Sequence, residues 1–496
     1  MGKEKKIMKE NDFKATQGLS FAMSLLAFLL IMAVLIVGVL VFEVKMPILL
    51  FICWLIVIPF GILAKVPFSV QSEGAAEMVK RGLDGITIIL AVGAMVGAWI
   101  SAGTVQALIN VGLEIINPKI FLLSTLILCS IVSLFTGTSW GTIGTAGIAM
   151  MGVGAGLGMP PGLTAGAIIC GAFFGDKMSP LSDTTNMAPA IAGATVTEHV
   201  RHMMYTTIPA YIITALIFLV LGFKYNVSGG DLSSVGQLTG AIKSVCKVGF
   251  PAFIPAICVI TLLVMQKPAF PSIFIGALIG VAIAVLYQGV DLSAAIKSMY
   301  FGYSGEFNNN FLNKLLNRGG MTSMYELTAI MIAGLGLGGL LDKSTILPNV
   351  LKKVASRIHS VGMLTVVTML VSYVAYSVGG SHAFTHVLTG TLMRPLYFKF
   401  NLHPKNLSRT MEDSGTLIAP AIPWGGSAVY CATMLQVPTM TYLPFLFLTF
   451  IVPIFSIAYG FTGKFIEYIS PEDAEGRFKE DLENVEEDFK QSSSTQ

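Results

Sequence analysis

The feature that most limits what this chain can fold into is a run of 24 residues without a charged side chain, LSFAMSLLAFLLIMAVLIVGVLVF at 19–42. A helix needs about 20 apolar residues to cross the hydrocarbon core of a bilayer. The basic segment before the run resembles the start of a signal peptide. The run is too long for a signal-peptide core, however, and no small-residue cleavage site follows it. We therefore expect a retained first membrane span.

The rest of the chain has the same apolar character. Its mean hydropathy is +0.75 and only 12% of its 496 residues are charged, whereas about a quarter are charged in soluble domains. Further candidate spans lie at 47–65, 86–109, 119–136, 162–175, 206–222, 248–265, 270–289, 325–341, 361–379, 414–435 and 443–463. The short alternating segments of a membrane β-barrel are missing. The sequence predicts an all-α polytopic membrane protein with about 11–13 transmembrane segments.

Three blocks of sequence recur at a nearly constant spacing, which indicates a tandem duplication. The aligned pairs are 81–105 with 321–346, 133–150 with 376–393, and 175–189 with 412–429. We expect two structural repeats, inverted relative to each other, as is common in secondary transporters. The predicted divisions are a cytoplasmic N-terminal segment (1–17), the first repeat (18–222), a loop (223–247), the second repeat (248–463) and an acidic tail (464–496).

Two segments rich in Gly, Ser and Thr stand where apolar spans should continue: TGTSWGTIGTAG from 136 and VGGSHAFTHVLTG from 378. Irregular backbone at membrane depth is tolerated where it lines a cavity, so we expect one re-entrant hairpin in each repeat. The alternative is a pair of small-residue helix-packing faces. The Ser and Thr side chains of these segments can supply oxygen ligands.

The stretch GDKMSPLSDTTNMAP (175–189) predicts a broken helix. Pro180 cannot donate a backbone hydrogen bond and disfavours helix at the residue before it, so we expect unwinding between 176 and 183. Ser182 or Asp183 would then cap a second half-helix. Oxygen ligands suit a hard cation, and the set expected to bind Na⁺ is Asp183, Thr184 and Asn186. Asp176 is a candidate proton or ion carrier; the alternative is a structural ion pair with Lys177 or a remote base.

The second break has different chemistry. Glu412 and Asp413 precede it, and the half-helix beyond it has no carboxylate. We expect this half to offer a solute-binding surface; a helix start paired with Arg409 is the alternative for the two acids. The candidate solute or pathway residues are Ser381, His382, His386, Glu412, Asp413, Trp424, Gly425, Gly426 and Ser427.

The two histidines at 382 and 386 share one helical face, a spacing also found in zinc sites. The glutamate of HExxH is missing and no third ligand is evident, so we expect pathway or core histidines and no catalytic zinc. No nucleotide-binding loop of the GxxxxGK[ST] type occurs, which argues against an ATP-driven pump. We expect no cofactor apart from the coupling ions Na⁺ and H⁺.

The block FGDKMSPLSDTTNMAPAIAG, with TGTSWGTIGTAGIAMMGVG before it and PKNLSRTMEDSGTLIAPAIPWGG after it, resembles the NhaC family. That family comprises bacterial Na⁺/H⁺ antiporters and related malate/lactate exchangers. The resemblance implies a sodium site between the tip of the first hairpin and the first break. The tip residues are Thr136, Thr138 and Ser139, and those of the break are Ser182, Asp183, Thr184 and Asn186. At 423–428 the chain reads PWGGSA where the family has a PWNTCG-like pattern, so the solute is left open.

The resulting prediction is a Na⁺/H⁺ antiporter and not an enzyme. The alternative is a Na⁺- or H⁺-coupled exchanger or symporter of a small organic anion, of the malate/lactate type, or of an amino acid. We expect a multi-pass protein of the bacterial cytoplasmic membrane, with its lysine-rich N-terminus on the cytoplasmic side. Its expected partners are the lipid bilayer, the transported ions and a second copy of the chain in a homodimer, with no nucleic acid.

Overall fold

The computed structural model describes residues 19–42, 44–81, 83–115, 117–180, 182–225, 240–265, 267–306, 313, 316–317, 319–344, 346 and 358–474. Across these ranges the chain is helical, and β pairing is limited to one isolated bridge between Leu402 and Tyr468. The prediction of an all-α fold is therefore confirmed. The predicted N-terminal segment 1–17, most of the loop 223–247 and most of the tail 464–496 lie outside the described residues.

The first half contains α1 (Phe21–Leu40), α2 (Met46–Leu63), α3 (Phe68–Arg81), α4 (Leu83–Ser101), α5 (Thr104–Ile115), η2 (Pro118–Ile120), α6 (Phe121–Thr136), α7 (Ser139–Thr142), η3 (Ile143–Gly147), α8 (Ile148–Gly156), α9 (Pro161–Met178), α10 (Asp183–Ala192) and α11 (Val196–Lys224). The second half contains η4 (Phe250–Phe253), α13 (Ile254–Val264), α14 (Ala269–Ile283), η5 (Ala284–Gln288), α15 (Leu292–Phe301), η6 (Met321–Met324), α17 (Tyr325–Lys343), α19 (Val361–Gly379), α20 (His382–Lys399), α21 (Pro404–Met411), η7 (Glu412–Thr416), η8 (Ala419–Ala421), α22 (Gly426–Leu435), α23 (Thr439–Tyr442), η9 (Leu443–Phe445) and α24 (Phe447–Thr462). The segments η3, η5 and η7 are π-helical.

Six helices in the described part of the chain are long and apolar enough to cross a membrane, or eight if each of two bent pairs counts as one span. The bends measure 73° between the α4 and α5 segments and 50° between Thr439–Phe445 and Phe447–Thr462. These helices confirm a multi-pass membrane protein. Among the other predicted spans, 19–42 and 162–175 correspond to the single helices α1 and α9, whereas 414–435 is divided between η7, η8 and α22. The total of about 11–13 spans stays a prediction.

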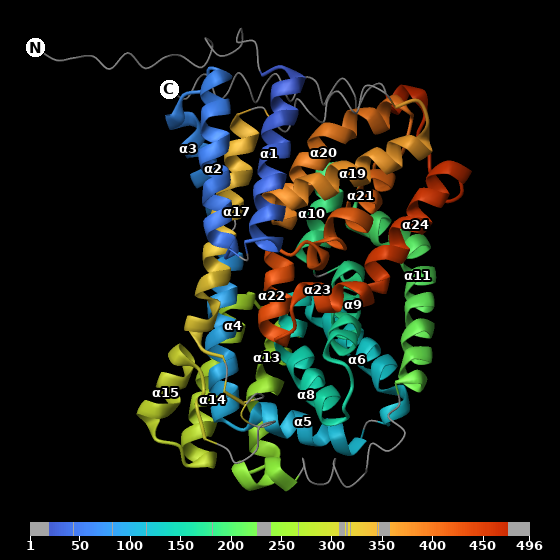
Figure 1. The fold of residues 1–496 in the computed structure, drawn as a ribbon. Helices are drawn as coiled ribbons and strands as arrows, with labels where there is room; N and C mark the ends of the chain where they lie inside the picture. The colour runs from blue at the N-terminus through green and yellow to red at the C-terminus, as the bar shows by residue number, and fades with distance from the viewer. Residues whose placement is uncertain are drawn as a thin grey trace, which may run out of the picture.

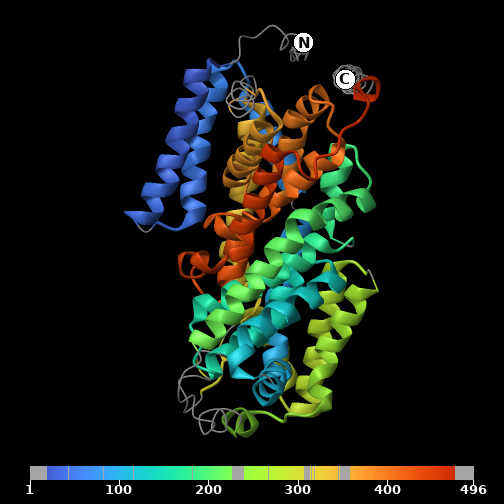
Figure 2. The ribbon, with the colours of Figure 1, turned by 90° about the vertical axis from the view of Figure 1, so that its right-hand side faces the viewer.

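The broken helices lie in the interior of the molecule. In Figure 1, α2, α3 and α17 stand together along one side, α6, α9 and α11 occupy another, and α22 lies near the centre. Figure 2 shows the α1–α2 hairpin at the outer edge. The short α22 thus lies among helices from both halves of the chain.

A close backbone contact between α6 and α9 fixes the end of α9. A Cβ at Gly171 would collide with the Leu126 carbonyl, and one at Gly175 would collide with the Ser130 carbonyl. The Ser133 hydroxyl also donates to the Ala172 carbonyl at 2.6 Å. Small residues spaced by four are what close helix approach in membranes requires. The contact holds the polar C-terminus of α9 beside the C-terminus of α6.

The two segments predicted as hairpins break with the same local geometry. After α6 the chain turns at Gly137 (φ 67°), and Thr138 caps α7 by accepting a hydrogen bond from the Gly141 amide. After α19 it turns at Gly380 (φ 62°), and Ser381 caps α20 by accepting from the amide three residues on. A positive φ favours glycine, and Ser and Thr favour N-caps.

The first charged break lies where the sequence predicted it. Helix α9 ends at Met178, and α10 begins at Asp183 with Ser182 at its N-cap position. The second break is longer. Helix α21 continues as the π-helical segment η7, passes through η8, and the next helix, α22, begins only at Gly426.

Candidate functional site

A cavity of about 310 Å³ lies where the helix breaks from both halves of the chain meet. Its lining includes most of the residues that the sequence singled out, drawn from four separate segments. They are Thr138, Ser139, Asp176, Ser182, Asp183, Thr184, Ser381, His382, Gly426 and Ser427. Trp140, Met187, Met331 and Tyr376 complete much of the wall. The cavity thus brings together residues of the first break, of both Gly/Ser/Thr-rich segments and of α22.

Asp176 joins the first break to the first hairpin tip. Its carboxylate accepts a hydrogen bond from the Ser139 hydroxyl at 2.7 Å, and its side chain is buried. The Thr185 hydroxyl donates to the carbonyls of Asp176 and Lys177 at 3.2 and 3.1 Å, which satisfies carbonyls freed where α9 ends. The carboxylate is therefore held at a fixed place in the cavity wall.

The cavity is rich in oxygen atoms and in negative charge. Asp183 is exposed at the start of α10, and the hydroxyls of Ser182 and Thr184 lie 3.1 Å apart beside it. The described lining residues include two carboxylates, the imidazole of His382 and the phenol of Tyr376, with no lysine or arginine. A concave site lined by one sign of charge concentrates ions of the opposite sign. This cavity suits a cation.

The second half of the chain supplies a more aromatic wall. The Trp140 indole lies 3.4 Å from the Ser427 hydroxyl, and the Ser427 amide lies 3.3 Å from the Tyr376 hydroxyl. The sequence interpretation did not include Trp140 or Tyr376. Trp140 had a detectable signal, because it stands inside the TGTSWGT segment.

Seven predicted residues lie outside the lining, and four of them are Thr136, Asn186, Trp424 and Gly425. The Asn186 side-chain amide donates to the carbonyls of Pro180 and Ser182, both at 2.8 Å, and so braces the first break. Thr136 is the last residue of α6. Two more belong to the second break: Trp424 donates to the Ser377 carbonyl, and Gly425 packs against the Tyr376 ring.

The remaining predicted residues, His386, Glu412 and Asp413, form a fully buried layer outside the cavity lining. Asp413 pairs with Lys177 at 2.7 Å, although the two are 236 positions apart in the sequence. The Glu412 carboxylate lies 3.6 Å from the His386 imidazole.

The structure thus gives partners other than those weighed from the sequence. Lys177 pairs with Asp413 and not with its neighbour Asp176. The Arg409 guanidinium donates to the Phe465 carbonyl at 2.9 Å. Over the described residues there is no group of three or more His, Cys, Asp or Glu side chains placed to hold a metal ion.

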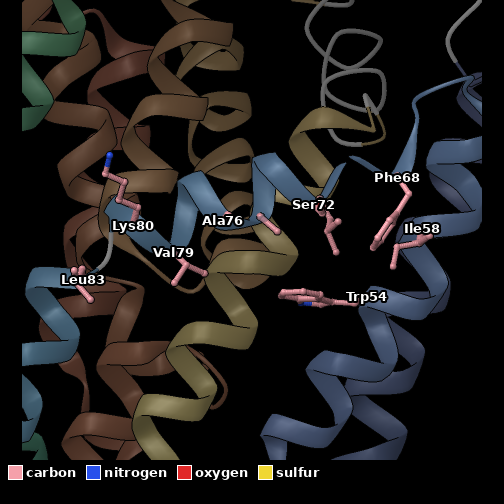
Figure 3. A pocket seen from close by; sticks show the side chains of 10 residues that line it. Trp54, Ile58, Phe68, Ser72, Ala76, Val79, Lys80 and Leu83 are labelled. Atoms are coloured by element: carbon pink, nitrogen blue, oxygen red, sulfur yellow. The ribbon is translucent and has the colours of Figure 1, made fainter. Parts of the chain in front are cut away.

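A larger groove of about 540 Å³ lies elsewhere, between α2, α3 and α17. Figure 3 shows Trp54, Ile58 and Phe68 on one side of it, with Val79 and Leu83 on the other. Its described lining is apolar apart from one serine and one lysine and contains no carboxylate. It therefore lacks the chemistry of the central cavity.

The family of the chain follows from the sequence that contains the two charged breaks. Residues 171–464, which include both charged breaks and the second hairpin segment, match the model of the Na⁺/H⁺ antiporter family. The chain belongs to this Na⁺/H⁺ antiporter family. The resemblance to NhaC proteins drawn from the sequence is confirmed.

Curated members of the Na⁺/H⁺ antiporter family and its relatives match along most of their length. The chain is 43% identical to the malate-2H⁺/Na⁺-lactate antiporter of Bacillus subtilis, over 84% of this chain and 90% of the relative. It is 37% identical to the Na⁺/H⁺ antiporter NhaC of Alkalihalophilus pseudofirmus, over 91% and 96%. It is 32% identical to the arginine/ornithine antiporter ArcD of Halobacterium salinarum, over 81% and 83%.

As a member of the Na⁺/H⁺ antiporter family, the chain is a secondary antiporter and a transporter rather than an enzyme. With its long apolar helices it is a multi-pass membrane protein that contacts the lipid bilayer and the ions it transports. Its relatives carry different solutes by name, so the family alone leaves the solute of this antiporter open.

Proposed function

We propose that this antiporter exchanges Na⁺ for H⁺ across the bacterial cytoplasmic membrane, and that the central cavity is the ion site. The observation that carries the proposal is the charge of the cavity wall: Asp176 and Asp183 face it, and no described lining residue is a lysine or arginine. Na⁺ prefers hard oxygen ligands. Asp183 and Thr184 supply such oxygens, while Asn186 keeps the break in place through its contacts with Pro180 and Ser182.

The same carboxylates explain exchange. A carboxylate that holds Na⁺ must be ionised, whereas a protonated carboxyl has lost the charge that attracts Na⁺. Na⁺ and H⁺ therefore compete for Asp176 and Asp183, and each ion displaces the other. Ser139 donates to Asp176 at 2.7 Å and stabilises its ionised form when Na⁺ is bound.

The proposal includes the duplicated architecture. We infer two inverted repeats, each with a re-entrant hairpin, about 11–13 spans in total, and a homodimeric assembly. The matching turns at Gly137 and Gly380, each followed by a hydroxyl side chain that caps the next helix, support the duplication.

A second candidate function is the exchange of a small organic solute together with Na⁺. The cavity measures about 310 Å³, whereas a single water molecule occupies about 30 Å³ of the liquid. It therefore has room for more than one Na⁺. Ser381, His382 and Ser427 provide hydrogen-bonding groups from the second half of the chain. The relative at 43% identity is named for malate and lactate. A carboxylate solute would contact the bound Na⁺, because the described lining offers it no lysine or arginine.

The test uses the purified full chain in liposomes that contain a pH-sensitive dye. A pulse of external Na⁺ should move protons outward and alkalinise the interior. Asp183→Asn should abolish this response, because an amide keeps the shape and loses the charge. The matched control is Asp291→Asn: Asp291 caps α15 outside the cavity, and asparagine caps helices equally well.

A wild-type response to Na⁺ alone supports Na⁺/H⁺ exchange. A response that requires added malate or lactate overturns it in favour of the second candidate. A normal Na⁺ response in Asp183→Asn would remove this residue from the ion site, and a loss in both variants would trace the defect to something other than the cavity charge.

A further inference from the structure

A second polar pocket, of about 390 Å³, lies at the opposite end of α22 from the central cavity. Its polar lining comes from the segment before α17 and from the end of α22. The polar side chains are Asn317, Thr322, Ser323, Thr433 and Gln436. The central cavity touches the first two residues of α22, Gly426 and Ser427. One short helix therefore connects two polar spaces.

Three helical segments run from the cavity to this pocket with the same spacing. Each segment contributes three residues that share one helical face. The first residue lines the cavity and the third lines the pocket. The second lies between them, three or four positions along the chain from each. The triplets are Ile88, Val92 and Val96 on α4; Trp140, Gly144 and Ile148 along α7, η3 and α8; and Ser427, Tyr430 and Met434 on α22.

The middle residues of the three triplets line neither pocket, and Gly144 packs against the other two, Val92 and Tyr430. A Cβ at Gly144 would lie 2.8 Å from the Tyr430 hydroxyl oxygen and 3.1 Å from a Val92 methyl carbon. Tyr430 is fully buried and stacks on Trp140, with ring centroids 4.7 Å apart and planes 11° apart. Its hydroxyl donates to the Trp140 carbonyl at 2.7 Å.

We propose that the second pocket is the vestibule through which the transported ion reaches the cavity from the other side of the membrane, and that the Trp140–Tyr430 stack is the gate between them. The inference rests on the assignment of the central cavity as the transport site. An antiporter must open its site to each side in turn. In the structure the Tyr430 ring, stacked on Trp140 and packed beside Gly144, lies between the cavity and this pocket.

The backbone beside the Trp140–Tyr430 stack is consistent with a gate that moves. Gly144 lies within the π-helical segment η3, and π-helical turns occur frequently at functional sites. Having no side chain, Gly144 leaves the space that the Tyr430 hydroxyl fills. In this proposal the Tyr430 ring moves away from Trp140 and Gly144 when the route opens. Ordinary core packing, the competing explanation, predicts that Tyr430 stabilises the fold and has no effect on access.

Labelling from each side of the membrane tests the route. Ala383→Cys places a thiol in the cavity wall and Thr433→Cys places one in the vestibule. A membrane-impermeant cationic thiol reagent is applied to right-side-out and inside-out vesicles. The wild type, which has six native cysteines, gives the background labelling. We expect the two thiols to react from opposite sides. Adding Tyr430→Ala should make the Ala383→Cys thiol reactive from both sides.

Ion flux tests the gate. Tyr430→Ala should raise Na⁺ entry that is not matched by proton exit by at least about tenfold, since a stacked pair and a hydrogen bond that bias the gate toward closure are removed. Tyr430→Phe keeps the ring and should give a smaller leak. Its matched control is Tyr442→Phe, which removes a buried hydroxyl bonded to the carbonyls of Pro420 and Ala428 and should give none. Gly144→Ala should also leak, because its methyl group displaces the Tyr430 hydroxyl.

Labelling of both thiols from one side overturns the vestibule. Equal leaks in Tyr430→Phe and Tyr442→Phe, or tight coupling in every Tyr430 and Gly144 variant, overturn the gate. If Tyr430→Ala does not fold, Tyr430→Phe and Gly144→Ala decide the question. The labelling pattern does not depend on which solute moves. If the two thiols react from opposite sides but the protein shows no response to Na⁺ in liposomes, Na⁺/H⁺ exchange is overturned and the proposed route is retained.

Discussion

The buried ion pair between Lys177 and Asp413 allows a quantitative prediction about stability. Both side chains are completely buried, and their charged atoms lie 2.7 Å apart. The Thr206 hydroxyl adds a hydrogen bond to the same Asp413 oxygen at 3.2 Å, and the Lys177 ammonium also contacts the Met203 sulfur at 3.4 Å. Lys177→Met would leave the Asp413 carboxylate with a single neutral donor.

Removing one partner of a buried pair costs about 3–5 kcal/mol, because the remaining charge stays desolvated without compensation. Replacing both partners by apolar residues of similar volume is often neutral, or stabilising by about 1–4 kcal/mol. We therefore expect Lys177→Met and Asp413→Leu each to lower the free energy of unfolding by about 3–5 kcal/mol. The double variant should recover most of that loss.

The assay is unfolding of the purified protein in mild detergent by a denaturing detergent, followed by far-UV circular dichroism, for the wild type, both single variants and the double variant. The coupling free energy follows from the four values. A loss below about 1 kcal/mol in Lys177→Met would be the size expected of an exposed pair and would contradict the buried geometry. Additive losses in the double variant would show that the two charges do not interact.

Two further substitutions test other contacts. Gly175→Ala should lower the free energy of unfolding by about 1–3 kcal/mol, the usual cost of overpacking, because its Cβ meets the α6 backbone. The control is Gly240→Ala, which should leave the free energy of unfolding unchanged, because a Cβ at Gly240 would meet nothing within 4 Å. Thermal unfolding in detergent compares the two variants. Ser139→Ala removes the 2.7 Å hydrogen bond to Asp176 and should raise the half-saturating Na⁺ concentration about tenfold, equivalent to about 1.4 kcal/mol. Ser139→Thr should restore it, and an unchanged Na⁺ dependence in Ser139→Ala would contradict a role for this contact.

Features with a local cause were predictable from the sequence. The first break falls between Met178 and Asp183, because Pro180 cannot continue a helix and a serine precedes the restart. The turns at Gly137 and Gly380 follow from glycine next to a hydroxyl residue, which is a local signal. The all-helical class follows from hydropathy alone.

Features that depend on packing between distant segments were not predictable. Glu412 and Asp413 were expected in the solute pathway, yet the structure buries both outside the cavity lining. Asp413 is held by its ion pair with Lys177, 236 positions away, and no periodicity in either segment encodes that pairing. The contact between Trp140 and Tyr430 joins residues 290 positions apart and escapes sequence reasoning for the same reason.

The absence of basic side chains from the described wall of the central cavity also has an electrical consequence. In the exchange proposed above, an empty cavity with both carboxylates ionised carries two negative charges. Carrying them through a potential of 100 mV involves about 4.6 kcal/mol, at about 2.3 kcal/mol per charge. One Na⁺ halves this work and two protons abolish it. The membrane potential would then act on the empty and Na⁺-loaded forms but not on the doubly protonated one, so voltage as well as the ion gradients would set the direction of transport.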